Sequence, residues 1–197
     1  MITTDRVKAT FDSVGGSLVR LELLSHVDTD DRNRKVFLFD RSAERVYKAQ
    51  SGLITAQAGV ALPNHWSPMK RIDGPTTLGG RNELAVRFES PGEGGVKLAK
   101  SYTFTRGSYV IDVKHEVVNG GGAAVTPQLY LGLERDGNPA RGESKWYFTF
   151  TGPAVYTDAK KFEKIDFKDI EKGKSGHATS ANDGWVAMVQ HYFSSAW

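Results

Sequence analysis

The chain has five histidines, and imidazole is the side chain best suited to metal binding and proton transfer near neutral pH. They are His26, His65, His115, His177 and His191. No two of them stand in an HxH, HxxxH or HExxH spacing, so the sequence encodes no local metal site. Ligands that converge from distant segments are the alternative. His115 lies within an alternating apolar stretch, and we interpret it as a histidine held in the core or at an interface.

Signatures of other catalytic and cofactor sites are also missing from the sequence. The chain contains no cysteine, which excludes disulfides, thiolate metal ligands and cysteine nucleophiles. It contains no GxSxG nucleophile elbow, Walker loop or GxGxxG fingerprint. The acidic stretch DTDD at 28–31 is too short for an EF-hand, and we interpret it as a solvated loop. We therefore expect no catalytic residue, metal or cofactor, and we do not expect an enzyme.

Aromatic side chains are the remaining candidates for ligand binding. Trp66 lies in a stretch rich in Gly and Pro, and Trp146 and Tyr147 open an expected strand. Exposed rings above a sheet can stack on sugars, although large rings more often fill cores or fix loops. A carbohydrate-binding or mutarotase-like, sugar-epimerising domain is therefore the alternative function. Such an epimerase needs a carboxylate base and a histidine acid in one pocket, and the sequence alone places no such pair.

The composition is that of a globular protein with a mild positive charge. The formal net charge is +3, and no run of five Lys or Arg occurs, so we expect no nucleic-acid partner. No segment has the ~18 consecutive apolar residues of a membrane span. No signal peptide opens the chain. We expect either a cytosolic protein or a piece of a longer one.

The elements that position these residues are predicted to be strands. Apolar and polar residues alternate in VKATF (7–11) and LVRLELL (18–24), which are joined by a glycine turn and predict a β-hairpin. Residues 96–119 predict two further long strands, and 56–80 a long loop. About a dozen strands with short connections indicate an all-β sandwich or barrel. We expect one such domain over residues 1–183.

Only the last stretch, GWVAMVQHYFSSAW (184–197), has a helical period. Its apolar residues recur at i, i+3, i+4, i+7, i+8, i+11 and i+12, and Asn182 or Asp183 is placed to cap the first turn. We expect an amphipathic helix whose apolar face is formed by Trp185, Met188, Val189, Tyr192, Phe193, Ala196 and Trp197. Most of this face should pack on the sandwich. Trp197 should lie near a membrane interface, which tryptophan favours.

Several stretches resemble the large periplasmic domain of the YidC/Oxa/Alb family of bacterial membrane protein insertases. The terminal stretch just quoted is similar to the segment that joins this domain to a transmembrane helix. TFTRGSYVIDVKHEVVN (103–119) is similar to the F-x-R-G-x-Y-x-I-x-V hairpin of the family. YKAQSGL (47–53), GGRNELAVRF (79–88) and the opening VKATFDSVGGSLVRLEL match its pattern in the right order.

The resemblance implies a fold, a location and a set of partners. The fold would be the β-supersandwich of the family, which is galactose mutarotase-like, with two packed antiparallel sheets and the C-terminal amphipathic helix. Residues 184–197 would lead toward a transmembrane segment absent from this chain. The domain would lie in the periplasm on an inner-membrane protein, without catalysis of its own. The full protein would insert and chaperone nascent membrane proteins with the Sec translocon and its SecD and SecF subunits. We expect the isolated domain to be monomeric.

Overall fold

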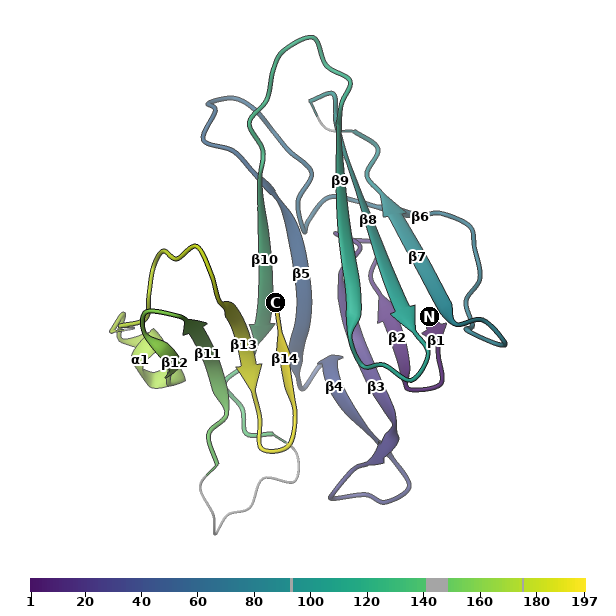
Figure 1. Cartoon of the computed structure of the whole chain (residues 1–197), viewed down its shortest axis with the longest axis vertical. Helices are drawn as coiled ribbons and strands as arrows, with labels where there is room; N and C mark the ends of the chain where they lie inside the picture. Colours follow the sequence, from purple (N-terminus) through teal and green to yellow (C-terminus); the bar gives the residue numbers. More distant parts are fainter. Residues whose placement is uncertain (93, 141–148, 175) are drawn as a thin grey trace.

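The computed structural model of the chain describes residues 1–92, 94–140, 149–174 and 176–197, and their regular structure is almost entirely β (Figure 1). The first sheet has six strands in the order β1-β2-β3-β4-β5-β10, with all pairs antiparallel. The strands are β1 (Ile2–Thr3), β2 (Val7–Phe11), β3 (Leu18–Val27), β4 (Lys35–Arg41), β5 (Val46–Ile54) and β10 (Gln128–Arg135). The predicted hairpin of residues 7–24 is confirmed as β2 and β3.

The second sheet faces the first and is built from one contiguous part of the chain. Its order is β6-β7-β8-β9, with β6 (Lys70–Arg71), β7 (Glu83–Glu89), β8 (Val96–Thr105) and β9 (Ile111–Asn119). The hydrophobic core lies between the two sheets, where the apolar residues of the alternating strands point inward. It includes Val7, Leu21, Leu23, Leu84, Val86, Phe88, Leu98 and Phe104. Burial of each such side chain is worth about 1.5–3 kcal/mol. The prediction of an all-β fold with packed antiparallel sheets is confirmed.

A third, smaller sheet stands beside the first two. Its order is β12-β11-β13-β14, with β11 (Gly152–Thr157), β12 (Lys161–Lys164), β13 (Trp185–Val189) and β14 (Ser194–Ala196). Between β12 and β13 lies one short helix, α1 (Phe167–Glu171). Among the described residues, no helix is long and apolar enough to span a bilayer. Trp146 and Tyr147, which the sequence assigned to a strand, lie outside the described residues.

The expected C-terminal helix is wrong, because residues 184–197 form a β-hairpin. β13 pairs with β11 on one side and with β14 on the other, and Gln190 N donates to Phe193 O across the turn at 2.8 Å. Neighbouring residues Ala187 and Met188, which point to opposite faces of the strand, are both buried. The run WVAMV is buried on both faces only at Ala187 and Met188, whereas Trp185 and Val186 stay exposed, and a continuous apolar run of this kind does not alternate. The helical spacing in this run was therefore coincidental.

The long loop between β5 and β6 is fixed at several points to β5 and to the turn between β2 and β3. Leu53 N donates to Pro63 O at 2.9 Å, Gly15 N to Ser67 O at 2.8 Å and Met69 N to Ser13 O at 2.7 Å. Gly15 has φ +70°, and a Cβ at this position would collide with the carbonyl oxygen of His65. The glycine turn between β2 and β3 therefore allows residues 62–69, which we call the strap, to lie against it.

Candidate interaction site

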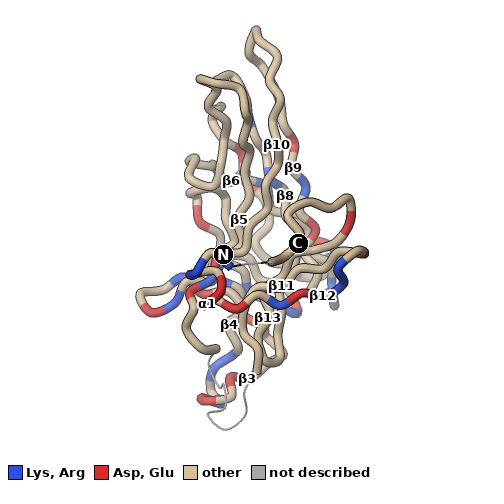
Figure 2. The backbone as a smooth tube through the Cα atoms, turned by 90° about the vertical axis from the view of Figure 1, so that its left-hand side faces the viewer, with Lys and Arg blue, Asp and Glu red and all other residues tan. Residues whose placement is uncertain are grey.

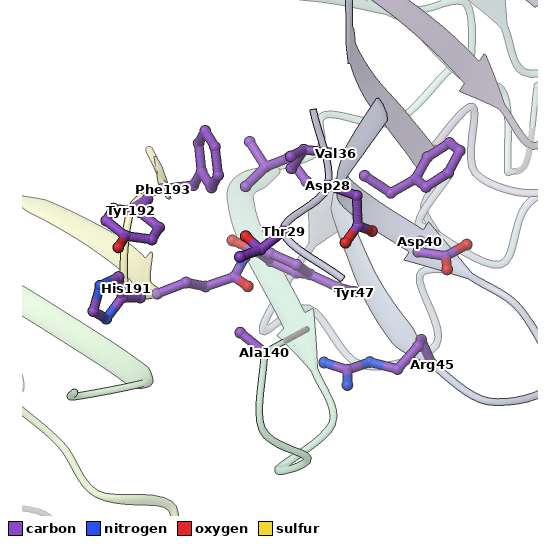
Figure 3. A pocket seen from close by; sticks show the side chains of 13 residues that line it. Asp28, Thr29, Val36, Asp40, Arg45, Tyr47, Ala140, His191, Tyr192 and Phe193 are labelled. Atoms are coloured by element: carbon purple, nitrogen blue, oxygen red, sulfur yellow. The ribbon is translucent and has the colours of Figure 1, made fainter. Parts of the chain in front are cut away.

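The turn of the C-terminal hairpin closes one side of a small pocket. Figure 3 shows His191, Tyr192 and Phe193 on one side, with Asp28 and Val36 of the first sheet facing them. The enclosed space is about 80 Å³. This is well below the ~300–1,000 Å³ of pockets that take drug-sized ligands, so the pocket has room for a single side chain or a few waters.

Tyr47 of β5 joins the first sheet to the hairpin at the base of this pocket. Its hydroxyl lies 2.6 Å from Ser195 Oγ and donates to Met188 O at 3.5 Å. Burial raises the pKa of Tyr47 to about 12, so the phenol stays protonated at physiological pH and keeps its hydrogen to donate. The edge of the Phe39 ring packs against it, with 4.8 Å between ring centroids.

The charged groups around the pocket are engaged in holding loops. Arg45 Nη1 donates to Pro139 O at 2.6 Å, and its Nε lies 3.6 Å from a carboxylate oxygen of Asp136. Asp28 is buried and accepts a hydrogen bond from the Asp30 amide at 2.9 Å. These bonds hold the loop at 136–139 and the turn at 28–31 in place, and Asp40 and His191 also line the pocket.

The seven residues predicted to form one apolar helix face are spread over several places. Met188 is buried in the main core, and Val189 is half-buried beside it. Phe193 packs at the pocket against the His26 ring, whereas Tyr192 is 73 % exposed at the turn. Trp185 lies on the third sheet, stacked on Tyr156 with 5.7 Å between ring centroids. Trp197, which we expected near headgroups, is partly buried, and its Nε1 donates to Gly132 O at 3.2 Å.

A groove between the first two sheets is a second concave feature. The groove is lined by apolar side chains of both sheets and by the end of the hairpin, including Leu21, Phe39, Tyr102, Ile111, Leu133 and Trp197. β10 stands at one edge of the first sheet and β9 at one edge of the second (Figure 1), and each has a paired strand on one side only among the described residues. Val117, Leu129 and Leu131 on these strands are 40–48 % exposed. Which strands form the edges of a sheet depends on how the strands pair, and the alternation of apolar and polar residues in the sequence does not specify that pairing.

Two basic groups are held between the sheets at the closed side of this groove. Lys100 is fully buried, and its ammonium donates to Gly15 O and Ser51 O, both at 2.6 Å. His115 Nε2 lies 2.7 Å from Ser51 Oγ, which confirms its interpretation as a core or interface histidine. Burial lowers the pKa of Lys100 to about 8, and burial with the nearby Lys100 charge lowers the pKa of His115 to about 4. Ser51 itself is 1 % exposed, so this arrangement is closed to substrates.

The remaining charges are dispersed over the surface. Figure 2 shows Lys and Arg interspersed with Asp and Glu along the described backbone. Several of them form ion pairs, as Arg87 does with Glu89 on its own strand and with Glu116 of β9 on the outer face of the second sheet. Within the described residues, no group of three or more His, Asp or Glu is placed to hold a metal ion.

Comparison with known proteins gives one family. The family described as the YidC periplasmic domain matches residues 1–197. The chain is 51 % identical over 197 residues to a membrane protein insertase YidC of Cupriavidus necator, covering 100 % of this chain and 34 % of that protein. It is 49 % identical over 195 residues to the protein of the same name from Janthinobacterium sp. (strain Marseille), and this match covers 99 % of this chain and 34 % of that protein. For the protein of the same name from Bordetella pertussis the identity is 45 % over 197 residues, and this match covers 100 % of this chain and 35 % of that protein. The chain thus spans about a third of the length of these relatives.

Proposed function

Because the chain belongs to the YidC periplasmic domain family, we propose that it serves as the interaction module of a membrane protein insertase. As a periplasmic domain of an inner-membrane protein, it lies where segments of nascent membrane proteins emerge. The relatives are named insertases, a name that denotes no enzymatic reaction, in agreement with the expectation of a non-enzymatic domain. In this proposal the whole protein inserts and chaperones nascent membrane proteins, and the domain contacts these clients and the SecD and SecF subunits.

The observation that supports this role is the pair of open strand edges at the groove. An extended peptide can add to an open edge through backbone hydrogen bonds, while its alternate side chains enter neighbouring apolar positions. β9 and the part of β10 before Gly132, whose carbonyl accepts from Trp197, offer such edges, flanked by the exposed apolar side chains of Val117, Leu129 and Leu131. Exposed apolar edges are normally blocked in soluble proteins, since they invite pairing with other chains. Their presence here favours a partner that is itself extended and apolar.

Photo-crosslinking in membranes tests this proposal. A photoreactive residue is placed at position 117 or 129 of the full-length protein, in membranes that contain the Sec components and a client under synthesis. Adducts with the client or with SecD or SecF are expected from both positions. Positions 73 and 83, which are exposed and lie away from the groove, are the matched controls. If the groove positions give no more adducts than the controls, the proposal is wrong.

A further inference from the structure

Trp66 belongs to the strap, and its side chain does not pack in the hydrophobic core. Its side chain is 70 % exposed, although the residues on both sides of it are tied down. Its own amide donates to Asn64 Oδ1 at 2.8 Å, and Ser67 N donates to Asn64 O at 3.1 Å, which closes a tight turn. Pro63 is bonded to β5 and Ser67 to the turn between β2 and β3, as described above. The backbone of the loop therefore holds the indole at a fixed place although the ring does not pack in the core. A ligand that binds the indole would not have to order the loop.

The groups next to the indole are polar and lie over the outer face of β5 and β10. The Lys48 ammonium is 5.7 Å from the centre of the Trp66 ring and 3.1 Å from a Glu134 carboxylate oxygen. The His65 ring lies 4.8 Å from the indole. The His65 amide donates to the Tyr130 hydroxyl at 3.0 Å, and its Nδ1 also contacts that hydroxyl. Tyr130 itself is seated over Gly52, where any Cβ would collide with its hydroxyl.

We propose that Trp66, with Lys48 and Glu134, is a binding platform for a neutral saccharide. A pyranose ring has an apolar face of C–H groups that can stack on an open aromatic ring, and a rim of hydroxyls that both donate and accept hydrogen bonds. The Lys48 ammonium is a donor and the Glu134 carboxylate an acceptor, so one hydroxyl rim satisfies both. The net charge of the pair is zero, which favours an uncharged sugar. This inference does not depend on the proposed insertase role.

The same surroundings argue against the two other common uses of an exposed tryptophan. At a protein interface, such a residue is surrounded by contacts that add little binding energy but exclude water. A protein partner that bound here would have to desolvate the Lys48–Glu134 ion pair, which is unfavourable. At a lipid surface, the Glu134 carboxylate, whose side chain is 49 % exposed, would face anionic headgroups. A sugar replaces the water at both charges with its own hydroxyls.

Titration of the 197-residue chain with chitotetraose, a neutral β-linked sugar, tests the platform by calorimetry and by tryptophan fluorescence. We expect saturable binding in the millimolar range, with a shift of the Trp66 emission. Trp66→Ala should weaken binding about tenfold or more, and Trp66→Tyr should retain part of it, because a smaller ring still stacks. Lys48→Gln combined with Glu134→Gln should weaken binding severalfold without loss of the stacking signal.

Trp185→Ala is the matched control, since this tryptophan is also exposed but lies on the third sheet. It should bind the sugar as the parent does. The inference is overturned by the absence of saturable binding in the parent chain, or by Trp66→Ala binding as well as the parent with an unchanged melting temperature. It is equally overturned if Trp185→Ala weakens binding as much as Trp66→Ala, because the effect would then not belong to this platform.

Discussion

Lys100 and His115 stand opposite each other on β8 and β9, and both project between the sheets. Each joins the second sheet to β5 of the first, Lys100 through the Ser51 carbonyl and His115 through the Ser51 hydroxyl. No carboxylate is hydrogen-bonded to either group among the described residues, so a second positive charge here is not compensated. The two carbonyl hydrogen bonds therefore stabilise the lysine ammonium, and the same surroundings disfavour protonation of the histidine.

His115 should make the domain sensitive to acid. Its pKa of about 4 in the folded state lies below the ordinary 6.5, so the unfolded chain binds more protons between these values. The contribution of His115 to the free energy of unfolding should therefore be fully present above pH 6.5 and should be lost as the pH falls toward 4. The loss from this group is at most about 3 kcal/mol. His115→Gln, which keeps a partner for Ser51, should flatten this part of the curve in urea unfolding measured at each pH. An unchanged slope in the variant would show that other groups cause the acid loss.

At the scale of elements, the hairpin β13–β14 joins the third sheet to the core. Its turn closes the pocket, Met188 enters the main core, and Trp197 bonds to the edge of β10. Tyr47 is the polar contact that joins this hairpin to β5. The position of the hairpin thus depends on both apolar packing and one buried hydroxyl pair.

A double-mutant cycle measures the contribution of that pair. Tyr47→Phe removes the hydroxyl and keeps the ring, and should lower the free energy of unfolding by about 1 kcal/mol, because Ser195 loses its partner. Ser195→Ala should cost a similar amount. The double variant should be less destabilised than the sum, by about 0.5–1 kcal/mol, since the two changes remove one interaction. Strict additivity in thermal or denaturant unfolding would mean that the two hydroxyls do not interact.

The sequence predicted the strands of the first two sheets because each has one buried and one solvated face. β2, β3, β7 and β8 alternate for this reason, as in the burial of Leu84, Val86 and Phe88 on β7. β13 is buried on both faces at Ala187 and Met188, and its lack of alternation led to the helix prediction. The charged stretch 160–174, with its spaced aromatic residues, contains both β12 and α1. Short apolar segments are decided by their tertiary partners, which the local pattern does not contain.

The candidate site could be predicted only in part for a related reason. Composition and motifs pointed away from local metal and nucleophile signatures, and Trp66 was considered as a ring for stacking. The groove needs β10 to pair with β5, and the pocket needs the hairpin turn to reach Asp28 and Val36. Such long-range contacts are not encoded in the spacing of neighbouring residues. That residues 184–197 lead toward a membrane-spanning segment stays a prediction.

At the scale of the whole molecule, the hairpin should be required for stability and not only for attachment. Deletion of residues 184–197 removes the central strand of the third sheet and takes Met188 and Trp197 from the core. A loss of about 3–5 kcal/mol is expected, which corresponds to a melting temperature lower by about 10 °C. Tyr192→Ser, a change at a largely exposed side chain of the same hairpin, is the control and should leave the melting temperature unchanged. A truncated domain that melts with the parent would show that the hairpin is dispensable.

The pairing of β10 with β5 also constrains the order in which the chain can assemble. Ile54 pairs with Gln128 and Tyr47 with Arg135, and the entire second sheet lies between them in the sequence. A chain that emerges from its N-terminus can complete the second sheet from consecutive hairpins, whereas the first sheet must wait for residue 135. Until then β5 is an open edge of an unfinished sheet, and high contact order makes its closure the slow step of folding. The period in which this domain itself resembles an unfolded client is therefore set by the distance between β5 and β10 along the chain.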